Sequence, residues 1–294
     1  MNVSRHRWQW VCIPLVTLFV CMIVTAPVLA FTKENADEQQ AMADTSSTIT
    51  INEYEEISNL AKQSTSELKN EGFSSQEIAS IYSYRKEFKN HVEELNKMSD
   101  DALADSGYTL SQIEDIRNFD GSSATLARVS AKCSLNGKVD MIKYYDKHTH
   151  ARITYNWSWS GIPVYKMTDM VAVGWGSWHL VSQSGSVVYY NLISGKLYKS
   201  ANTTLVKSDQ QSGKAHKFKM LIDDHYYAKK GAGSFSLRGT VQAKQDIYFY
   251  MEYGHMVIRV TPSVSFGISG IDPTIQFEKG VNTAAKDRGH AICP

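Results

Sequence analysis

The sequence predicts an α+β protein in which a helical N-terminal region precedes an antiparallel β-sandwich or a partly closed barrel. Apolar residues recur at spacings of three and four between Ile51 and Asn118, whereas polar and apolar residues alternate after Gly121. The charge changes at the same point, because residues 31–121 contain 19 acidic and 8 basic residues and residues 122–294 contain 11 acidic and 21 basic residues. We therefore expect two domains of opposite charge that attract each other.

Residues 1–30 have the pattern of a secretory signal peptide. Arg5 and Arg7 precede an apolar run that continues to Ala30. Pro27 breaks the helix where cleavage needs extended chain, which favours cleavage after Ala30. The alternative is an uncleaved anchor, because about 20 apolar residues can also span a bilayer. In both cases the protein is expected to be secreted or to lie on the outer face of the cell membrane.

Residues 31–50 are polar and predict a disordered tether. Residues 51–121 predict an acidic helical domain with an internal repeat. In the two copies, Gly72 and Gly107 end one helix, and Ser74 and Thr109 begin the next with capping boxes. A helix pair that reads nucleic acid is not expected, because phosphate would repel the excess of acidic residues.

Residues 122–294 predict a basic antiparallel β domain of about eight short strands. Alternation is clear in residues 152–160, where Ile153, Tyr155, Trp157 and Trp159 face one way. Residues 235–242 and 247–253 alternate in the same manner. Glycines between such segments predict turns: Gly185, Gly195, Gly213 and Gly254.

All four tryptophans after the signal peptide lie within 22 residues. Tryptophan suits sugar stacking and membrane interfaces, because it joins a large apolar face to one polar N–H. Trp157 and Trp159 are expected either in the core with Trp175 or on a platform that contacts a ligand or lipid. Trp178 follows a predicted bend and is expected to present an exposed ring.

Lysines crowd residues 196–230 of the β domain. Such loops are often only solvated surface, but cell-wall polymers and anionic lipid headgroups outside the cytoplasm attract this charge. Lys229 and Lys230, together with Trp178, are therefore candidate contacts with an envelope component. The acidic residues of the helical domain are expected to dock on these lysines.

Catalytic and metal-binding patterns are weak. His148 and His150 lie on the same face of a predicted strand and can hold a metal only with a third ligand, which no spacing marks. Asp169 stands alone beside an apolar strand, where it can cap a turn or pair with Arg152. Gly-x-Ser-x-Gly and His-Glu-x-x-His motifs are absent from the sequence. No catalytic residue and no cofactor is predicted, and a non-enzymatic function is favoured.

Cys133 and Cys293 are the two cysteines outside the signal peptide. In an exported chain they predict one disulfide that ties the C-terminal tail to the region near Cys133. The alternative is a pair of buried thiols.

The segments Trp157-Ser-Trp-Ser-Gly-Ile-Pro163 and Asp169-Met-Val-Ala-Val-Gly-Trp175 resemble those of uncharacterised exported proteins of Gram-positive bacteria. The resemblance covers about a third of the chain. It implies export and no known activity, so no functional residue is carried over.

These observations favour an exported, non-enzymatic protein whose basic, tryptophan-rich β domain binds a cell-wall polymer, an anionic membrane surface or an extracellular protein. The acidic helical domain would dock on that β domain. One alternative is a membrane-active, toxin-like or bacteriocin-like protein that inserts residues 233–243 and 247–260 as a hairpin. Another is a metal-dependent hydrolase that uses His148 and His150.

Overall fold

The computed structural model describes residues 50–206, 212–258, 264–269, 272–277 and 281–294, all within one compact unit, Ala41–Pro294. The predicted signal peptide, residues 1–30, and residues 31–49 of the predicted tether lie outside the described residues. Among the described residues, no helix combines the length and the apolar composition needed to cross a bilayer.

The predicted helical region contains a series of short helices around one long helix. They are α1 (Glu53–Leu60), α2 (Thr65–Asn70), α3 (Ser75–Leu95), α4 (Asp100–Asp105), α5 (Leu110–Arg117) and α6 (Ser123–Val129). The two predicted capping boxes are present at the starts of α3 and α5. Gly72 and Gly107 adopt φ angles of 86° and 97°, the left-handed conformation that ends a helix. The predicted repeat is thus explained by local hydrogen bonding.

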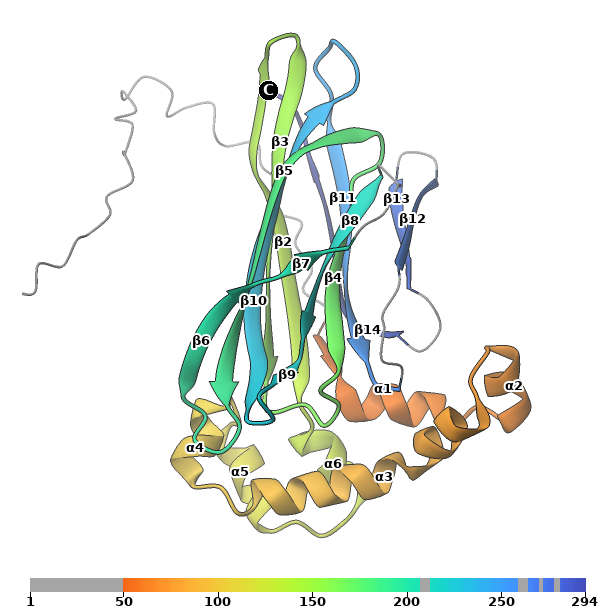
Figure 1. The fold of residues 1–294 in the computed structure, drawn as a ribbon, viewed down its shortest axis with the longest axis vertical. Coiled ribbons are helices and arrows are strands. Elements are labelled where there is room, and N and C mark those ends of the chain that lie inside the picture. Colours follow the sequence, from red (N-terminus) through yellow and green to blue (C-terminus); the bar gives the residue numbers. More distant parts are fainter. Residues whose placement is uncertain (1–49, 207–211, 259–263, 270–271, 278–280) are drawn as a thin grey trace, which may run out of the picture. The chain divides into compact units, whose positions relative to one another are not determined.

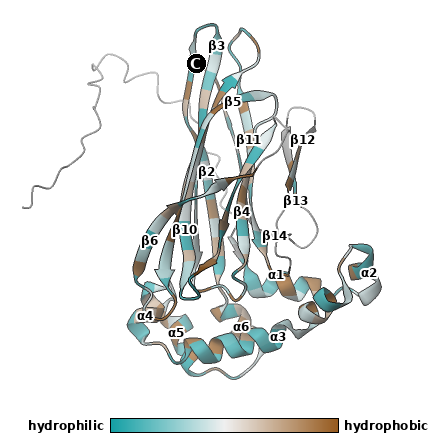
Figure 2. Ribbon diagram, viewed as in Figure 1, coloured by the Kyte–Doolittle hydropathy of each residue, from teal (hydrophilic) through white to brown (hydrophobic). Residues whose placement is uncertain are grey.

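Helix α3 is amphipathic. Its buried residues are spaced by three, four or seven positions and pack in the helical core, while its other residues are mostly hydrophilic (Figure 2). The buried set is Ile78, Ile81, Phe88, Val92 and Leu95.

The described strands pair in antiparallel sheets (Figure 1). One sheet of seven strands has the order β1-β2-β3-β10-β5-β6, with β9 paired to β10. Its strands are β1 (Thr50–Asn52), β2 (Lys132–Tyr145), β3 (His148–Ser160), β5 (Trp178–Asn191), β6 (Leu197–Asn202), β9 (Leu221–Ile222) and β10 (Tyr226–Gly239).

A second sheet of five strands has the order β14-β11-β4-β8-β7, and two further strands form a separate β12-β13 hairpin. These strands are β4 (Thr168–Gly174), β7 (Thr204–Leu205), β8 (Gly213–Lys219), β11 (Ile247–Met256), β12 (Val264–Ser269), β13 (Asp272–Phe277) and β14 (Val281–Ala291). The predicted fold class is confirmed, and the arrangement is a sandwich of two sheets.

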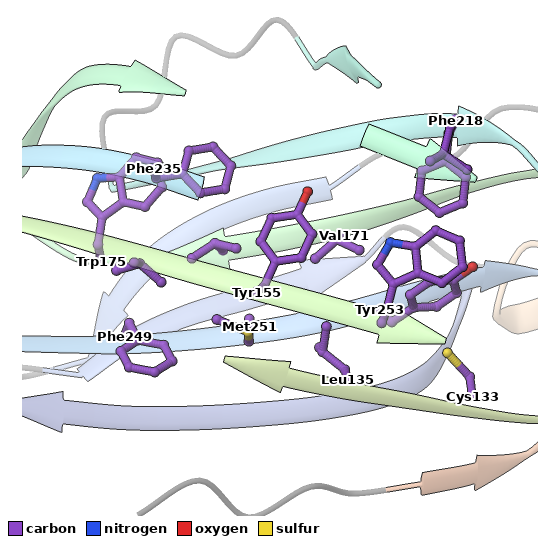
Figure 3. Close-up of a cluster of buried hydrophobic side chains, with 14 of the residues drawn as sticks. Cys133, Leu135, Tyr155, Val171, Trp175, Phe218, Phe235, Phe249, Met251 and Tyr253 are labelled. Carbon is purple, nitrogen blue, oxygen red and sulfur yellow. The ribbon is translucent and has the colours of Figure 1, made fainter. Parts of the chain in front are cut away.

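Aromatic side chains fill the space between the two sheets (Figure 3). As the alternation predicts, β3 buries every second residue from Ala151 to Trp159. The Trp157 ring stacks on Phe218 of the opposite sheet at a centroid distance of 4.7 Å and meets Tyr253 edge-on at 5.1 Å. These contacts join the seven-stranded sheet to the five-stranded sheet.

The strands around Gly233–Ala243 and Ile247–Val260 do not form the predicted hairpin. Strand β10 pairs with β3 and β5 in one sheet, and β11 pairs with β4 and β14 in the other. The chain crosses between the sheets instead of folding back on itself. The hairpin that the membrane-active alternative requires is therefore not formed in this structure.

The helices and the sheets share contacts at one end of the sandwich. Strand β1, directly before α1, pairs with β2 from Thr50 opposite Ser134 to Asn52 opposite Lys132. The hydrophobic cluster of the helices also contains Tyr227 of β10. A division into separate domains at Gly121 stays a prediction.

Candidate functional site

Three charged side chains meet inside the protein where α1, β4 and β11 come together. His255 places Nδ1 2.8 Å from Oδ2 of Asp169 and Nε2 3.1 Å from Oε1 of Glu53. Asp169 also accepts hydrogen bonds from the Tyr253 hydroxyl at 2.8 Å and from the backbone N–H of Met256 at 3.0 Å. We call Glu53, Asp169 and His255 the buried charge cluster.

Glu53 extends this cluster to the loop between β3 and β4. Its carboxylate accepts the backbone N–H groups of Val164 at 2.8 Å and Tyr165 at 2.9 Å. The same loop is held by the hydroxyl of Tyr108, which accepts the N–H of Ile162 at 3.0 Å. The first residue of α1 therefore fixes a loop more than 100 residues away in sequence.

The environment of His255 keeps its imidazole protonated. Burial alone would lower its pKa, but the charges and hydrogen bonds of Asp169 and Glu53 outweigh burial and raise the pKa to about 10. The side chains of all three residues are at most 3% exposed. The hydrogen bonds of the cluster join α1, β4, β11 and the loop between β3 and β4.

A cavity of about 910 Å³ lies on the outer face of the seven-stranded sheet. A row of short side chains crosses five strands in register beneath it: Asn136, Asn156, Ala232, Ser186 and Asn202. Since the neighbours of these residues along each strand point into the core, the row points outward. We call this cavity the outer groove.

A second row lies beside the first in the outer groove. It contains Lys138, Thr154, Ser234 and Ser184 on β2, β3, β10 and β5. The hydroxyl oxygens of Ser184 and Ser234 are 3.0 Å apart and share a hydrogen bond. Apart from Lys138, the side chains of both rows are short and leave the backbone of the sheet close to any ligand in the groove.

A hydrogen-bonded chain of Tyr155, His216 and Gln183 lies behind the outer groove. The Tyr155 hydroxyl lies 2.6 Å from Nδ1 of His216, and Nε2 of His216 lies 2.5 Å from Oε1 of Gln183. Burial lowers the pKa of His216 to about 4, so the ring is neutral and can accept from Tyr155 while donating to Gln183. Glycine is required at Gly233, because an added Cβ would lie 2.4 Å from the Tyr155 hydroxyl.

The outer groove offers neutral hydrogen-bonding chemistry. Of its fifteen lining residues, all in the described part of the chain, Lys138 alone is charged. Seven others on the two rows carry hydroxyl or amide groups, and such groups both donate and accept. No histidine or carboxylate lies among the lining residues to act as a base for the serine hydroxyls. This arrangement suits the binding of a polar, uncharged ligand.

The tryptophans proposed as contact residues are buried. Trp157 and Trp159 are each 2% exposed, and Trp178 is 3% exposed. The expectation of an exposed Trp178 ring is wrong, because this residue begins β5, pairs with Gly239 of β10 and turns its ring into the core between the sheets. Trp159 donates its indole N–H to the Tyr253 hydroxyl at 3.0 Å.

The two candidate lysines differ in their surroundings. Lys229 is half-buried, and its ammonium group donates to the backbone carbonyl of Asp105 at the end of α4. Its Nζ also lies 5.0 Å from the centre of the Tyr190 ring, and burial lowers its pKa. Lys230 is exposed and lies opposite Ser158 on the outer face, one row from the outer groove.

His148 and His150 lie at the opposite end of β3 from the helices. Nδ1 of His148 is 3.1 Å from the carbonyl oxygen of Gly239, and the His150 ring stacks on Tyr145 at 3.8 Å. Within the described ranges, no group of three or more His, Cys, Asp or Glu residues could hold a metal ion.

The predicted disulfide is wrong, because Cys133 and Cys293 are both free and buried. Cys133 lies opposite Trp159, whereas the Cys293 sulfur accepts a hydrogen bond from Thr149 at 3.6 Å. Trp159 and Thr149 are ten residues apart on β3, which is about 33 Å of extended strand. A disulfide needs Cα atoms within about 7 Å.

We expect thiol titration of the chain from Phe31 to find both cysteines reduced. Burial, followed by the charge of Asp169, raises the pKa of Cys133, so this thiol should react with Ellman's reagent only after unfolding. Mobility on a non-reducing gel should match that on a reducing gel. A band that moves faster without reductant would contradict the assignment.

The sequence analysis does not predict the buried charge cluster. Asp169 is expected to cap a turn or to pair with Arg152, but Arg152 pairs with Asp140 at 2.8 Å. The signal that could have found the cluster was a carboxylate in an otherwise apolar strand, since a buried charge needs an opposite charge. For the outer groove, the sequence indicated only that every second residue of these strands is polar, and not that these residues line one cavity.

Comparisons with known proteins identify no family. No family model matches the chain, and no curated protein matches it. Among solved structures it is similar to the C-terminal domain of the AgI/II polypeptide BspA of Streptococcus agalactiae, with a TM-score of 0.27, 12% identity and coverage of 48% of this chain. The match spans 42% of the length of that BspA chain.

Two other similar structures are collagen-binding domains of surface proteins. The domain from a Staphylococcus aureus adhesin has a TM-score of 0.27 and 8% identity, with coverage of 51% of this chain and 95% of that domain. The subdomain of the Enterococcus faecalis surface protein ACE has a TM-score of 0.24 and 10% identity, with coverage of 49% of this chain and 91% of the subdomain.

Proposed function

We propose that this protein is an exported, non-enzymatic binding protein that holds an extended polypeptide in the outer groove. The observation that carries the proposal is the row of Asn136, Asn156, Ala232, Ser186 and Asn202 across five strands. Neighbouring strands are about 4.8 Å apart, so the row offers polar groups over about 19 Å. Peptide groups of an extended chain could pair with the four polar members of the row, Asn136, Asn156, Ser186 and Asn202.

The chemistry of the groove favours a polypeptide over a sugar polymer. Asparagine amides and serine hydroxyls both donate and accept, which matches the N–H and C=O groups of a peptide backbone. Sugar rings stack on aromatic faces, and the side chains of the two rows include none. The tryptophans that could have stacked on a sugar are buried in the core.

In this proposal, the opposite charges of the helical region and the β domain contribute less to ligand binding than the polar rows of the groove. Lys138 and Lys230 would add attraction for an acidic segment of the ligand at the margin of the groove. Docking of the helices on β10 is supported by the contact of Lys229 with the Asp105 carbonyl, a backbone group and not a carboxylate. Because Lys229 contacts the Asp105 carbonyl within the protein, Lys230 is the lysine of the two that a ligand can reach.

Filling the groove tests the proposal. Ala232 is exposed at the centre of the row, so Ala232→Trp should fold normally and occupy the space of a ligand chain. Leu110→Trp is the matched control, because Leu110 is 85% exposed on α5. We expect the chain from Phe31 to bind immobilised gelatin and collagen, with affinity at least tenfold lower for Ala232→Trp and unchanged for Leu110→Trp.

A second pair of variants tests hydrogen bonding without adding bulk. Asn136→Ala and Asn156→Ala should each lower affinity about fivefold, since a hydrogen bond is worth about 1 kcal/mol. Purified cell wall and anionic vesicles serve as competing ligands in the same assay. The proposal is overturned if gelatin and collagen do not bind, if Ala232→Trp binds them normally, or if groove variants affect binding to cell wall alone.

A further inference from the structure

One end of the β-sandwich gathers exposed apolar side chains from segments that are distant in sequence. Tyr144 and Tyr145 are 41% and 54% exposed on the β2–β3 hairpin, Val241 is 50% exposed between β10 and β11, and Ile292 is 59% exposed after β14. We call these four residues and the loops that carry them the apolar tip. In Figure 1 the β2–β3 hairpin and the C-terminus lie at this same end.

Hydrogen bonds hold the loops of the apolar tip together. The hydroxyl of Thr149 donates to the Ala243 carbonyl at 3.3 Å and accepts the Gln245 N–H at 2.9 Å. The same hydroxyl contacts the Cys293 sulfur at 3.6 Å, and Asp246 accepts the Cys293 N–H at 3.0 Å. The loops that carry the exposed residues are therefore linked to one another by hydrogen bonds.

The charge of the apolar tip is positive. Exposed basic residues surround its apolar side chains: Lys143, Lys147, Arg238 and Lys244. The exposed acidic residues at this end are Asp146 and Asp246. Asp246 turns one carboxylate oxygen inward to the Cys293 N–H and places the other 3.6 Å from His290. Basic groups beside exposed tyrosines are the combination that binds an anionic lipid surface.

We propose that the apolar tip docks on an anionic membrane surface, with Tyr144, Tyr145, Val241 and Ile292 entering the interface and the surrounding basic residues contacting lipid phosphates. Tyrosine suits this depth, because its ring is apolar and its hydroxyl stays hydrated. Moving aliphatic side chains out of water lowers the free energy, and the negative surface potential attracts basic residues.

This site is separate from the outer groove. Asn156 at the centre of the groove is eight residues along β3 from His148 at the tip, about 26 Å of extended strand. A membrane-bound protein would therefore keep the groove available for a polypeptide. Failure of one site in an experiment does not imply failure of the other.

Vesicle sedimentation tests the proposal with the chain from Phe31, which contains the whole compact unit. The vesicles are phosphatidylcholine with or without phosphatidylglycerol, at low and high salt. We expect binding only with phosphatidylglycerol, weakened by salt. Lys147→Glu should lower the affinity at least fivefold, since each basic residue near the surface contributes about that factor. Tyr144→Ser combined with Tyr145→Ser should lower it at least tenfold, whereas Ala232→Trp in the groove should bind as the wild type.

A tryptophan reporter checks the orientation and does not depend on affinity. Tyr145→Trp should be quenched by brominated lipid in phosphatidylglycerol vesicles, because its ring would lie in the interface. Leu110→Trp on α5 should not be quenched, and the native tryptophans at positions 157, 159, 175 and 178 are buried. The proposal is overturned by absence of binding, by equal binding to pure phosphatidylcholine, by tip variants that bind normally, or by quenching of Leu110→Trp alone.

Discussion

We expect Glu53→Ala to lower the free energy of unfolding by about 3–5 kcal/mol, the usual effect of removing one partner from a buried ion pair. The substitution leaves the buried His255 without one of its two carboxylates. It also leaves the N–H groups of Val164 and Tyr165 without their acceptor. A buried donor without a partner costs about 1–3 kcal/mol, so the two effects act together.

Denaturant titration followed by tryptophan fluorescence measures this effect. Glu55→Ala is the matched control, because Glu55 is exposed two residues later on the same helix and should change stability by less than about 0.5 kcal/mol. Glu53→Gln retains an oxygen acceptor but loses the charge, so we expect a smaller loss. Hydrogen exchange at Val164 and Tyr165 should accelerate in Glu53→Ala. A loss below about 1 kcal/mol, or unchanged exchange, would contradict the role of Glu53.

We expect the stability of the protein to fall as the pH rises from about 6.5 to about 10. The pKa of His255 is about 10 in the folded state, and an unperturbed histidine has a pKa of about 6.5. Because the folded-state value is raised, the contribution of the imidazolium is complete below pH 6.5 and is lost as the pH rises through 10. The slope approaches about 1.4 kcal/mol per pH unit, and the total is on the order of 5 kcal/mol.

The comparison with His255→Gln isolates this contribution. Buried Lys166, whose pKa burial lowers, acts in the opposite direction over part of the range, and it is present in both proteins. The difference in unfolding free energy between wild type and His255→Gln should therefore shrink steadily as the pH approaches 10. A difference that stays constant from pH 6.5 to 10 would show that His255 is neutral in the folded state.

Local patterns predicted much of the fold. The starts of α3 and α5 follow from capping boxes, in which Ser74 and Glu77, or Thr109 and Gln112, satisfy backbone groups within three residues. The buried face of β3 follows from alternation, since side chains on a strand point to opposite faces in turn. Both signals depend only on neighbouring residues, so they can be read from the chain.

Local patterns in the sequence did not predict which distant segments pair with each other. The alternation in β10 and β11 is equally consistent with a hairpin and with strands of two different sheets, because each strand has one buried face in both arrangements. Gly185 was predicted as a turn but lies within β5, where an added Cβ would lie 2.1 Å from the Thr203 hydroxyl. Cysteine number likewise says nothing about the distance between Cys133 and Cys293.

The sequence by itself determined that a helical region precedes the main strands, where α3 and α5 begin, and which side chains of β3 share one face. Hydrogen bonds and hydrophobic periods over a few residues decide these features. The tertiary structure alone decided that Glu53, Asp169 and His255 share one buried site, that Trp178 is covered, and that polar residues of five strands align in the outer groove. These features depend on sheet order and register, which bring together residues up to 202 positions apart and which local patterns in the chain do not specify.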